Sequence, residues 1–270
     1  MTENEFQNFV EITRRLRREC PWDKVQTHES IRHSLIEEAY EVVETIDHGN
    51  YEELRGELGD ILLHVVFHSN IAEEEGKFAL PDVIRGITEK LIRRHPHIFG
   101  SATVRDAAEV KKTWERLKME EGRKSMMDGV PKELPGLLRA HRLTDKASKV
   151  GFDWKTGDDA WKKVEEEIRE LRETLGPESE DAREEEFGDL LFALVNYSRF
   201  IGVNPENAIR RSIDKFISRF RYIEEKLREE GKDIHASTLE EMDAHWNAAK
   251  LVAKPGTNPG SRSLSSTPLA

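Results

Sequence analysis

Cysteine is almost absent from this 270-residue chain, and long apolar runs are absent altogether. Cys20 is the single cysteine, so no disulfide forms within the chain, and its place before Pro21 indicates a small residue near a turn rather than a reactive thiol. The longest apolar stretches, 61–67 and 190–195, are far shorter than the roughly 20 residues of a membrane-spanning helix. The sequence does not open with a basic segment followed by an apolar one, so no secretory signal is expected. We therefore expect a cytoplasmic protein with no membrane partner.

Basic residues are too few to balance the acidic ones. Lysine and arginine number 42 against 53 aspartate and glutamate, which gives a net charge of −11. A negative protein of this kind repels a phosphate backbone, so we expect no nucleic acid partner. An acidic protein that acts on smaller phosphate compounds would need a divalent cation between its own charges and theirs.

Alternating β-branched patterns are also missing, and apolar residues instead recur every three or four positions, which predicts an all-α fold. Gly49-Asn50 should end one helix, and Asn204-Pro205 should begin another as N-cap and first-turn proline. Thr238 and Glu241 have the spacing of a capping box. In the first half we expect four helices, which contain Leu35 to Ile46, Glu52 to Ile71, Val83 to Leu91, and Val110 with Trp114 and Leu117. In the second half they carry Val164 to Leu175, Leu190 to Val195, Ile209 to Ile217, and Met242 with Trp246.

The length suggests two domains of roughly 120 residues each. Glycines and prolines gather between about 121 and 135, which indicates a connection there. We predict a helical module over 1–121, a linker over 122–135, and a second module over 136–254. Residues 255–270 are rich in Pro, Gly, Ser and Thr, and such a tail should be disordered because it buries too little apolar surface.

The most informative feature that the sequence does contain is a repeated set of four acidic residues. The first set is Glu38, Glu41, Glu57 and Asp60. The second set is Glu167, Glu170, Glu186 and Asp189, and each member follows its counterpart by 129 residues. Within each set, residues three apart share a helix face, so two packed helices would bring four carboxylates together.

Four converging carboxylates repel one another and lose solvation, so they need a compensating cation. Oxygen-only ligands in this number suit Mg²⁺, with Mn²⁺ as the alternative. A solvated face is the usual explanation of a single acidic run, and it fits charges such as Glu52 and Glu165. It explains the repeat less well, because four positions recur while neighbouring charges change. The pattern therefore predicts a metal site in each half.

Two further pairs recur, each with its members four residues apart. They are Lys90 and Arg94 with Lys215 and Arg219, and Trp114 and Lys118 with Trp246 and Lys250. Cations beside a carboxylate-bound metal are what a polyphosphate requires. Taken singly, each cation is equally well explained as a surface ion pair, and each tryptophan as a packing residue.

Other classes of protein fit the residues less well. His64 and His68 are spaced like a zinc pair, but the intervening glutamate of the protease signature is absent. A di-iron bundle needs Glu-x-x-His on two helices, and no histidine here has a glutamate three positions before it. A non-catalytic helical dimerisation protein is the remaining alternative. It does not explain why carboxylates and cations are duplicated together.

Several motifs resemble the MazG nucleoside triphosphate pyrophosphohydrolases over residues 5–252. The acidic motifs are Glu37-Glu38-Ala39-Tyr40-Glu41 with Glu57-Leu58-Gly59-Asp60, and Glu166-Glu167-Ile168-Arg169-Glu170 with Glu186-Phe187-Gly188-Asp189. The others are Cys20-Pro21-Trp22-Asp23-Lys24, Arg93-Arg94-His95-Pro96-His97 and Val150-Gly151-Phe152-Asp153-Trp154.

This resemblance implies an all-α bundle, a homodimer, and Mg²⁺-dependent cleavage of a nucleoside triphosphate to the monophosphate and diphosphate. It implies metal ligation by the second acidic set and favours the C-terminal module as the active one. Nucleotide contacts would come from Lys163, Lys215, Arg219, Trp246 and Lys250. The family has a lysine shortly before Glu186, where this chain has Asp181-Ala182-Arg183, so Arg183 is the candidate replacement. Glu166 or Glu37, next to the ligands, is the candidate general base.

Overall fold

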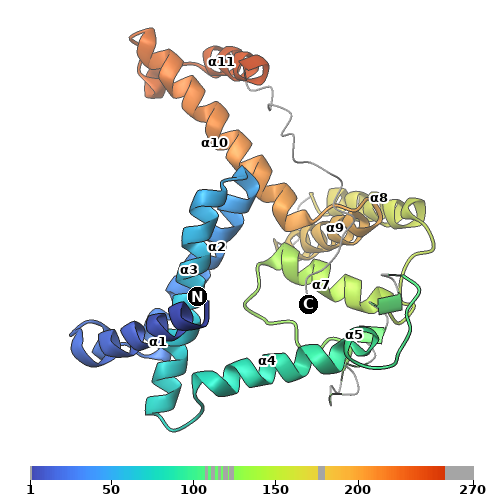
Figure 1. Cartoon of the computed structure of the whole chain (residues 1–270). Helices are drawn as coiled ribbons and strands as arrows, with labels where there is room; N and C mark the ends of the chain where they lie inside the picture. Colours follow the sequence, from blue (N-terminus) through green and yellow to red (C-terminus); the bar gives the residue numbers. More distant parts are fainter. Residues whose placement is uncertain are drawn as a thin grey trace. The chain divides into compact units, whose positions relative to one another are not determined.

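The computed structural model describes residues 2–106, 109–110, 113–114, 117, 121, 125–175 and 180–252. These residues form α-helices and short 3-10 turns, and no strand occurs among them, so the predicted all-α fold is confirmed (Figure 1). No helix in this part of the chain is long and apolar enough to cross a membrane. Contacts divide the chain into 1–104 and 105–270, and each unit is described separately. The module boundary at 121 and the disordered tail stay predictions; the tail and residues 122–124 lie outside the described residues.

The first unit is built on a helical hairpin. Its helices are α1 (Thr2–Glu19), α2 (His28–His48), α3 (Tyr51–Glu74), α4 (Leu80–Arg94) and α5 (Pro96–Phe99), with a 3-10 turn at η1 (Asp23–Val25). α2 packs along α3, and α1 also packs against α3 (Figure 1). α4 contacts α3 and α5.

Local signals explain why the hairpin forms where it does. Thr27 and Ser30 make a reciprocal capping box at the start of α2, which satisfies two backbone donors. Gly49 ends α2 with φ of 68°, a left-handed conformation that glycine adopts without steric cost. Asn50 then caps α3 by accepting a hydrogen bond from the backbone N–H of Glu53 at 3.3 Å. The expected break at Gly49-Asn50 is therefore confirmed.

Apolar contacts and one buried arginine hold the first unit together. Small clusters of buried side chains join the helices: Val10, Val66 and Leu80 in one, and Ile31, Phe67 and Ile71 in the other. Arg17 is 8% exposed and pairs with Glu74 at 2.8 Å. It also donates to the carbonyl oxygens of Asp23 and Gln26, so α1 and the loop before α2 are fixed together.

The second unit repeats the hairpin and extends it. Its helices are α7 (Gly136–Ser148), α8 (Gly157–Glu173), α9 (Glu180–Phe200), α10 (Pro205–Glu229) and α11 (Leu239–Val252), with η2 (Ile234–Ala236) between the last two. α8 packs along α9, and α7 packs on α9. The predicted caps are confirmed: Asn204 accepts from the N–H of Asn207, and Thr238 and Glu241 bond reciprocally.

The long helices α4 and α10 keep an apolar stripe uncovered in the described chain. Ile213, Phe216 and Ile217 of α10 are 41–56% exposed. On α4, Ile87 and Leu91 are 47% and 36% exposed. Periodicity correctly predicted these helices and their apolar faces, but the described helices leave these parts of the two faces largely exposed. Exposed apolar stripes of this length are typical of surfaces that meet a partner.

Candidate metal and nucleotide site

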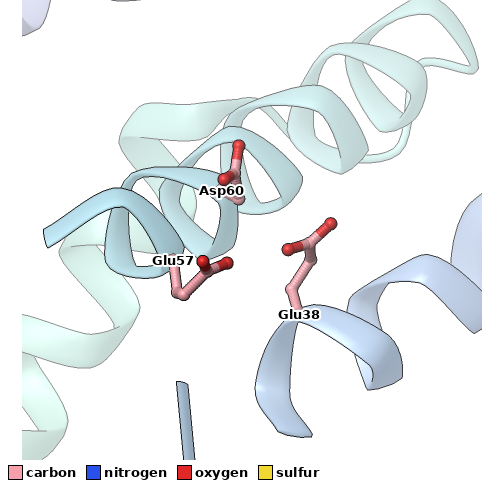
Figure 2. A group of neighbouring side chains, drawn as sticks. All are labelled: Glu38, Glu57 and Asp60. Atoms are coloured by element: carbon pink, nitrogen blue, oxygen red, sulfur yellow. The ribbon is translucent and has the colours of Figure 1, made fainter. Parts of the chain in front are cut away.

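The first acidic set converges across the α2–α3 hairpin. Glu38 from α2 and Glu57 and Asp60 from α3 each offer a carboxylate oxygen within 4.8 Å of the others, and the three side chains point toward one another (Figure 2). The turn at Gly49 produces this arrangement, because it folds α3 back along α2. These three carboxylates therefore converge, as the sequence pattern predicted.

Crowding of like charges raises the affinity of these carboxylates for protons. Loss of solvation, and then the charge of Asp60, raises the pKa of Glu38. Loss of solvation and the neighbouring Glu41 raise the pKa of Glu57. Glu41 acts on both Glu38 and Glu57 but is not one of the three acids that gather within 4.8 Å, so its place in the predicted quartet stays a prediction.

The second acidic set and the adjacent Glu166 form two overlapping groups that share Glu167. Glu166, Glu167 and Glu170 form one, and Glu167, Glu186 and Asp189 form the other, with oxygen atoms within 4.8 Å in each. Glu167 is only 4% exposed. Its Oε2 atom is buried and has no hydrogen-bond partner among the described residues. A buried carboxylate oxygen without a partner is costly unless a ligand satisfies it.

Lys163 supplies a positive charge at the second set. Its Nζ lies 2.6 Å from Glu166 and 2.6 Å from Glu167. Hydrogen bonds to Glu166 and Glu167 raise the pKa of Lys163 above its ordinary value of 10.5, so this cation is permanent. The corresponding position in the first half, 129 residues earlier, is Ser34. The two acidic sets therefore differ in charge balance, which a comparison of the acids alone does not reveal.

Glu170 and Glu186, two further acids of the second set, also repel their neighbours. Loss of solvation and the charge of Glu167 raise the pKa of Glu170. Loss of solvation and the charge of Glu170 raise the pKa of Glu186. Both sets offer hard oxygen ligands only, in groups of three or more, and one contains an unsatisfied buried oxygen. These donors fit Mg²⁺ or Mn²⁺.

Comparison with known proteins agrees with this chemistry. Residues 26–99 and 156–223 match the MazG nucleotide pyrophosphohydrolase domain, and these segments contain the two acidic sets. The chain belongs to the MazG family. A Thermotoga maritima relative named nucleoside triphosphate pyrophosphohydrolase/pyrophosphatase MazG is 45% identical over 91% of this chain and 95% of its own length.

Two further relatives extend the comparison. The nucleoside triphosphate pyrophosphohydrolase of Escherichia coli K12 is 38% identical over 92% of this chain and 97% of its own length. The uncharacterized protein YabN of Bacillus subtilis is 47% identical over 92% of this chain, which corresponds to 52% of YabN. The resemblance to MazG proteins noted from the motifs is thus confirmed over most of the chain.

Unlike Lys163, the cations predicted on α10 and α11 do not join the carboxylates of α8 and α9 in the described part of the chain. Arg219 on α10 lies over the ring of Trp246 on α11 at 5.3 Å, and Phe216 contacts the same ring at 5.4 Å. Lys250 donates to Asn247 at 2.7 Å. Lys215 is exposed on the same helix as Arg219. In the described chain α10 packs on α7 and α11 and makes no extended contact with α8 or α9.

The other predicted residues are placed as follows. Lys90 is exposed and Arg94 is buried on the last turns of α4, which makes no extended contact with α2 in the described chain. Trp114 is half-buried and belongs to the unit 105–270, whereas Lys118 lies outside the described residues. Arg183 is exposed on the first turn of α9, and Glu37 is exposed on α2. The roles predicted for these residues stay predictions.

The second unit also contains a cavity that the sequence motifs did not predict. It measures about 850 Å³ and is lined by loop residues 127–132 and 151–154 together with α7 and α9. The segment from Val150 to Trp154 carried the family resemblance but no chemical role. Loop residues have no periodic pattern, so only the fold reveals that they surround a cavity.

Proposed function

We propose that this protein is a Mg²⁺-dependent nucleoside triphosphate pyrophosphohydrolase, which converts a nucleoside triphosphate and water to a nucleoside monophosphate and diphosphate. The observation that carries the proposal is the convergence of carboxylates from paired helices, found twice in a chain of the MazG family. The names of the relatives in Thermotoga maritima and Escherichia coli support the same reaction.

The metal would be held by the carboxylates of either set, with Mn²⁺ as a possible substitute. In the second unit these are Glu167, Glu170, Glu186 and Asp189; in the first unit they are Glu38, Glu41, Glu57 and Asp60. When bound, the divalent ion supplies charge neutralisation of the triphosphate and activation of water. Oxygen ligands and the unsatisfied Oε2 of Glu167 support this assignment.

Lys163 and Glu166 give the second unit two functions beside the metal ligands. Lys163 keeps its proton, so it supplies a fixed positive charge for a phosphate oxygen. Glu166 lies 2.6 Å from Lys163 and next to Glu167, where its carboxylate orients or deprotonates the attacking water. Glu37 is the matching candidate in the first unit, where Ser34 stands in place of the lysine. This difference favours the second unit as the active one.

A second copy of the chain would complete the site. Lys215, Arg219, Trp246 and Lys250 lie on α10 and α11, and α10 keeps an exposed apolar stripe beside them. In a homodimer this stripe would be buried, and these cations would approach the carboxylates of the partner. The proposal thereby accounts for both the separation of the two groups in one chain and the uncovered face of α10.

The proposed substrates are nucleoside triphosphates with broad base specificity. Recognition through the metal, Lys163 and the α10 cations acts on the triphosphate, which every such substrate shares. We therefore propose that the enzyme clears or controls cytoplasmic nucleotide pools rather than acting on one nucleotide.

Release of diphosphate from a panel of nucleoside triphosphates, with and without Mg²⁺, tests the proposal. We expect activity that requires the metal, and a monophosphate as the product nucleotide. Glu186→Gln should lower kcat at least about 100-fold if the second unit is active, and Glu57→Gln should do so if the first unit is. A Glu57→Gln, Glu186→Gln double variant that retains full Mg²⁺-dependent cleavage would refute the carboxylate assignment.

A further inference from the structure

The cavity of about 850 Å³ in the second unit has the size and lining of a small-molecule site. Three aromatic side chains line it: Phe152, Trp154 and Phe192. They are 83%, 43% and 47% exposed, so their faces are accessible rather than buried in the core. Accessible aromatic faces around a hollow are suited to stacking against a flat ring.

This cavity leads toward the carboxylate cluster. A smaller cavity of about 440 Å³ is lined by Lys163 and Glu166 at one end. Asp153 and Trp154 line both cavities, so the two adjoin at these residues. A ligand with a flat ring at one end and phosphates at the other would therefore span from the aromatic cavity to Lys163, with its sugar near Asp153.

The walls of the larger cavity are fixed by polar contacts between its loops and helices. Lys146, 5% exposed, donates to the carbonyl oxygens of Met126 and Asp128 at 3.0 and 3.1 Å, which holds the loop 125–130 against α7. Arg199 pairs with both oxygens of Asp153 at 2.5 and 3.3 Å, which holds the loop 151–154 against α9. A ligand would therefore meet a preformed surface and would not have to order these loops.

Two of the polar side chains that line the cavity can donate a hydrogen bond to a ligand. Asn196 lines the cavity, and its Oδ1 accepts a hydrogen bond from Arg199 at 2.6 Å. Its amide nitrogen is therefore the group left for a ligand. Arg139 also lines the cavity, and its Nε is buried with no hydrogen-bond partner in the described part of the chain. Donors of this kind pair with carbonyl oxygens and ring nitrogens of a base.

We propose that this cavity holds the base of the nucleoside triphosphate, stacked on Phe152 and Trp154, while Asn196 and Arg139 donate to its edge. The inference rests on the proposed function and specifies the base site of the same enzyme. Stacking accepts every base, so specificity stays broad. The donors add a preference, up to about tenfold, for bases with a carbonyl oxygen at purine C6 or pyrimidine C4 (guanine, hypoxanthine and uracil) over adenine and cytosine, which carry an amino group there.

Steady-state kinetics with ATP, GTP, CTP and UTP test this assignment in the full-length protein. Phe152→Ala should raise KM for all four roughly 5- to 100-fold, because one stacking face is lost. Inorganic tripolyphosphate has no base, so its inhibition constant should stay within about twofold of wild type. The control is Leu175→Ala, which removes an apolar side chain of 67% exposure that lines neither cavity. It should change neither constant.

Asn196→Asp tests the donor edge separately, because it replaces the amide nitrogen by an acceptor of the same shape. The preference for GTP and UTP over ATP and CTP should disappear or reverse in this variant. If Phe152→Ala leaves every KM within about twofold, or raises the tripolyphosphate constant equally, the cavity does not hold the base and the inference fails. The proposed function would survive that result. Absence of diphosphate release by the wild-type protein would instead refute the proposed function, and the inference with it.

Discussion

At the scale of single residues, the balance between Lys163 and Glu167 distinguishes the two halves of the chain. Glu167 is buried with one oxygen unsatisfied, and Lys163 is the cation that its other oxygen contacts. Ser34 occupies the lysine position in the first half, where Glu38 is half-buried rather than buried. Burial of the acid and presence of the lysine therefore occur together, as expected if the cation offsets the cost of desolvation.

Lys163→Met should destabilise the second unit in the absence of metal. It leaves the buried Glu167 without a cation, so we expect a loss of about 1–3 kcal/mol in the free energy of unfolding. Millimolar Mg²⁺ should raise the melting temperature of the variant more than that of wild type, because the ion replaces the missing charge. Calorimetry with and without Mg²⁺ measures both effects. Lys162→Met is the matched control, since its side chain is 71% exposed and, in the described part of the chain, pairs with Asp159 alone. Equal destabilisation by both substitutions would contradict the role given to Lys163.

The raised pKa values of the acidic sets make metal affinity depend on pH. Glu38, Glu57, Glu170 and Glu186 all bind protons more readily than an isolated glutamate, whose ordinary pKa is 4.5. As pH falls through the raised values, protons displace the metal, so Mg²⁺ affinity should begin to fall above pH 4.5. The same shifts mean that the metal-free fold loses their stabilising contribution as pH rises through the raised values.

Titration calorimetry of Mg²⁺ between about pH 5 and pH 8 measures this dependence, including the protons released on binding. Glu170→Gln should flatten the curve, because it removes one of the repelling carboxylates. A constant affinity over this whole range would show that the carboxylates do not compete for protons and metal in this way.

At the scale of helices, local chemistry made most of the elements predictable from sequence. Thr27 and Thr156 occupy the same position of the repeat, and each caps the first helix of its hairpin. Gly49 has the left-handed conformation that a helix end favours. Caps, breaks and periodicity act within a few residues, so sequence alone specifies them. The three-residue spacing within each acidic pair likewise places both acids of the pair on one face of their helix. The hairpin turn then brings the two pairs together.

Longer-range features were not predictable in the same way. The stripe on α10 shows that one face of the helix is apolar, but periodicity does not say what covers that face. The separation of Lys215 from Glu186 depends on where α10 lies relative to α8 and α9, which no local pattern encodes. The aromatic cavity is formed by loops, and Phe152 becomes notable only when α7 and α9 surround it. Sequence therefore predicts the chemistry of the carboxylates but not the surfaces around them.

At the scale of the whole molecule, the described part of the chain does not bring together the two groups of residues that we propose for the nucleotide site. The carboxylates and Lys163 lie on α8 and α9, whereas Arg219 and Trp246 lie on α10 and α11. The apolar stripe of α10 is continuous with the second group, since Phe216 contacts Trp246. Because this surface is apolar and lies next to the cations of α10 and α11, we propose that it is an interface through which two copies complete each other's sites.

Charges introduced into this stripe should therefore abolish both assembly and catalysis. Ile213 and Ile217 are 49% and 41% exposed in the single chain, so an Ile213→Asp, Ile217→Asp variant should fold as before. Light scattering after size-exclusion chromatography should give twice the chain mass of 31.2 kDa for wild type and the single mass for the variant. If the partner supplies cations to the site, kcat/KM should fall at least about tenfold in parallel.

Ser218→Asp, on the opposite face of α10, is the matched control and should remain dimeric and active. A monomeric wild-type protein, or a monomeric variant with unchanged kcat/KM, would mean that one chain closes its own site by moving α10 against α8 and α9.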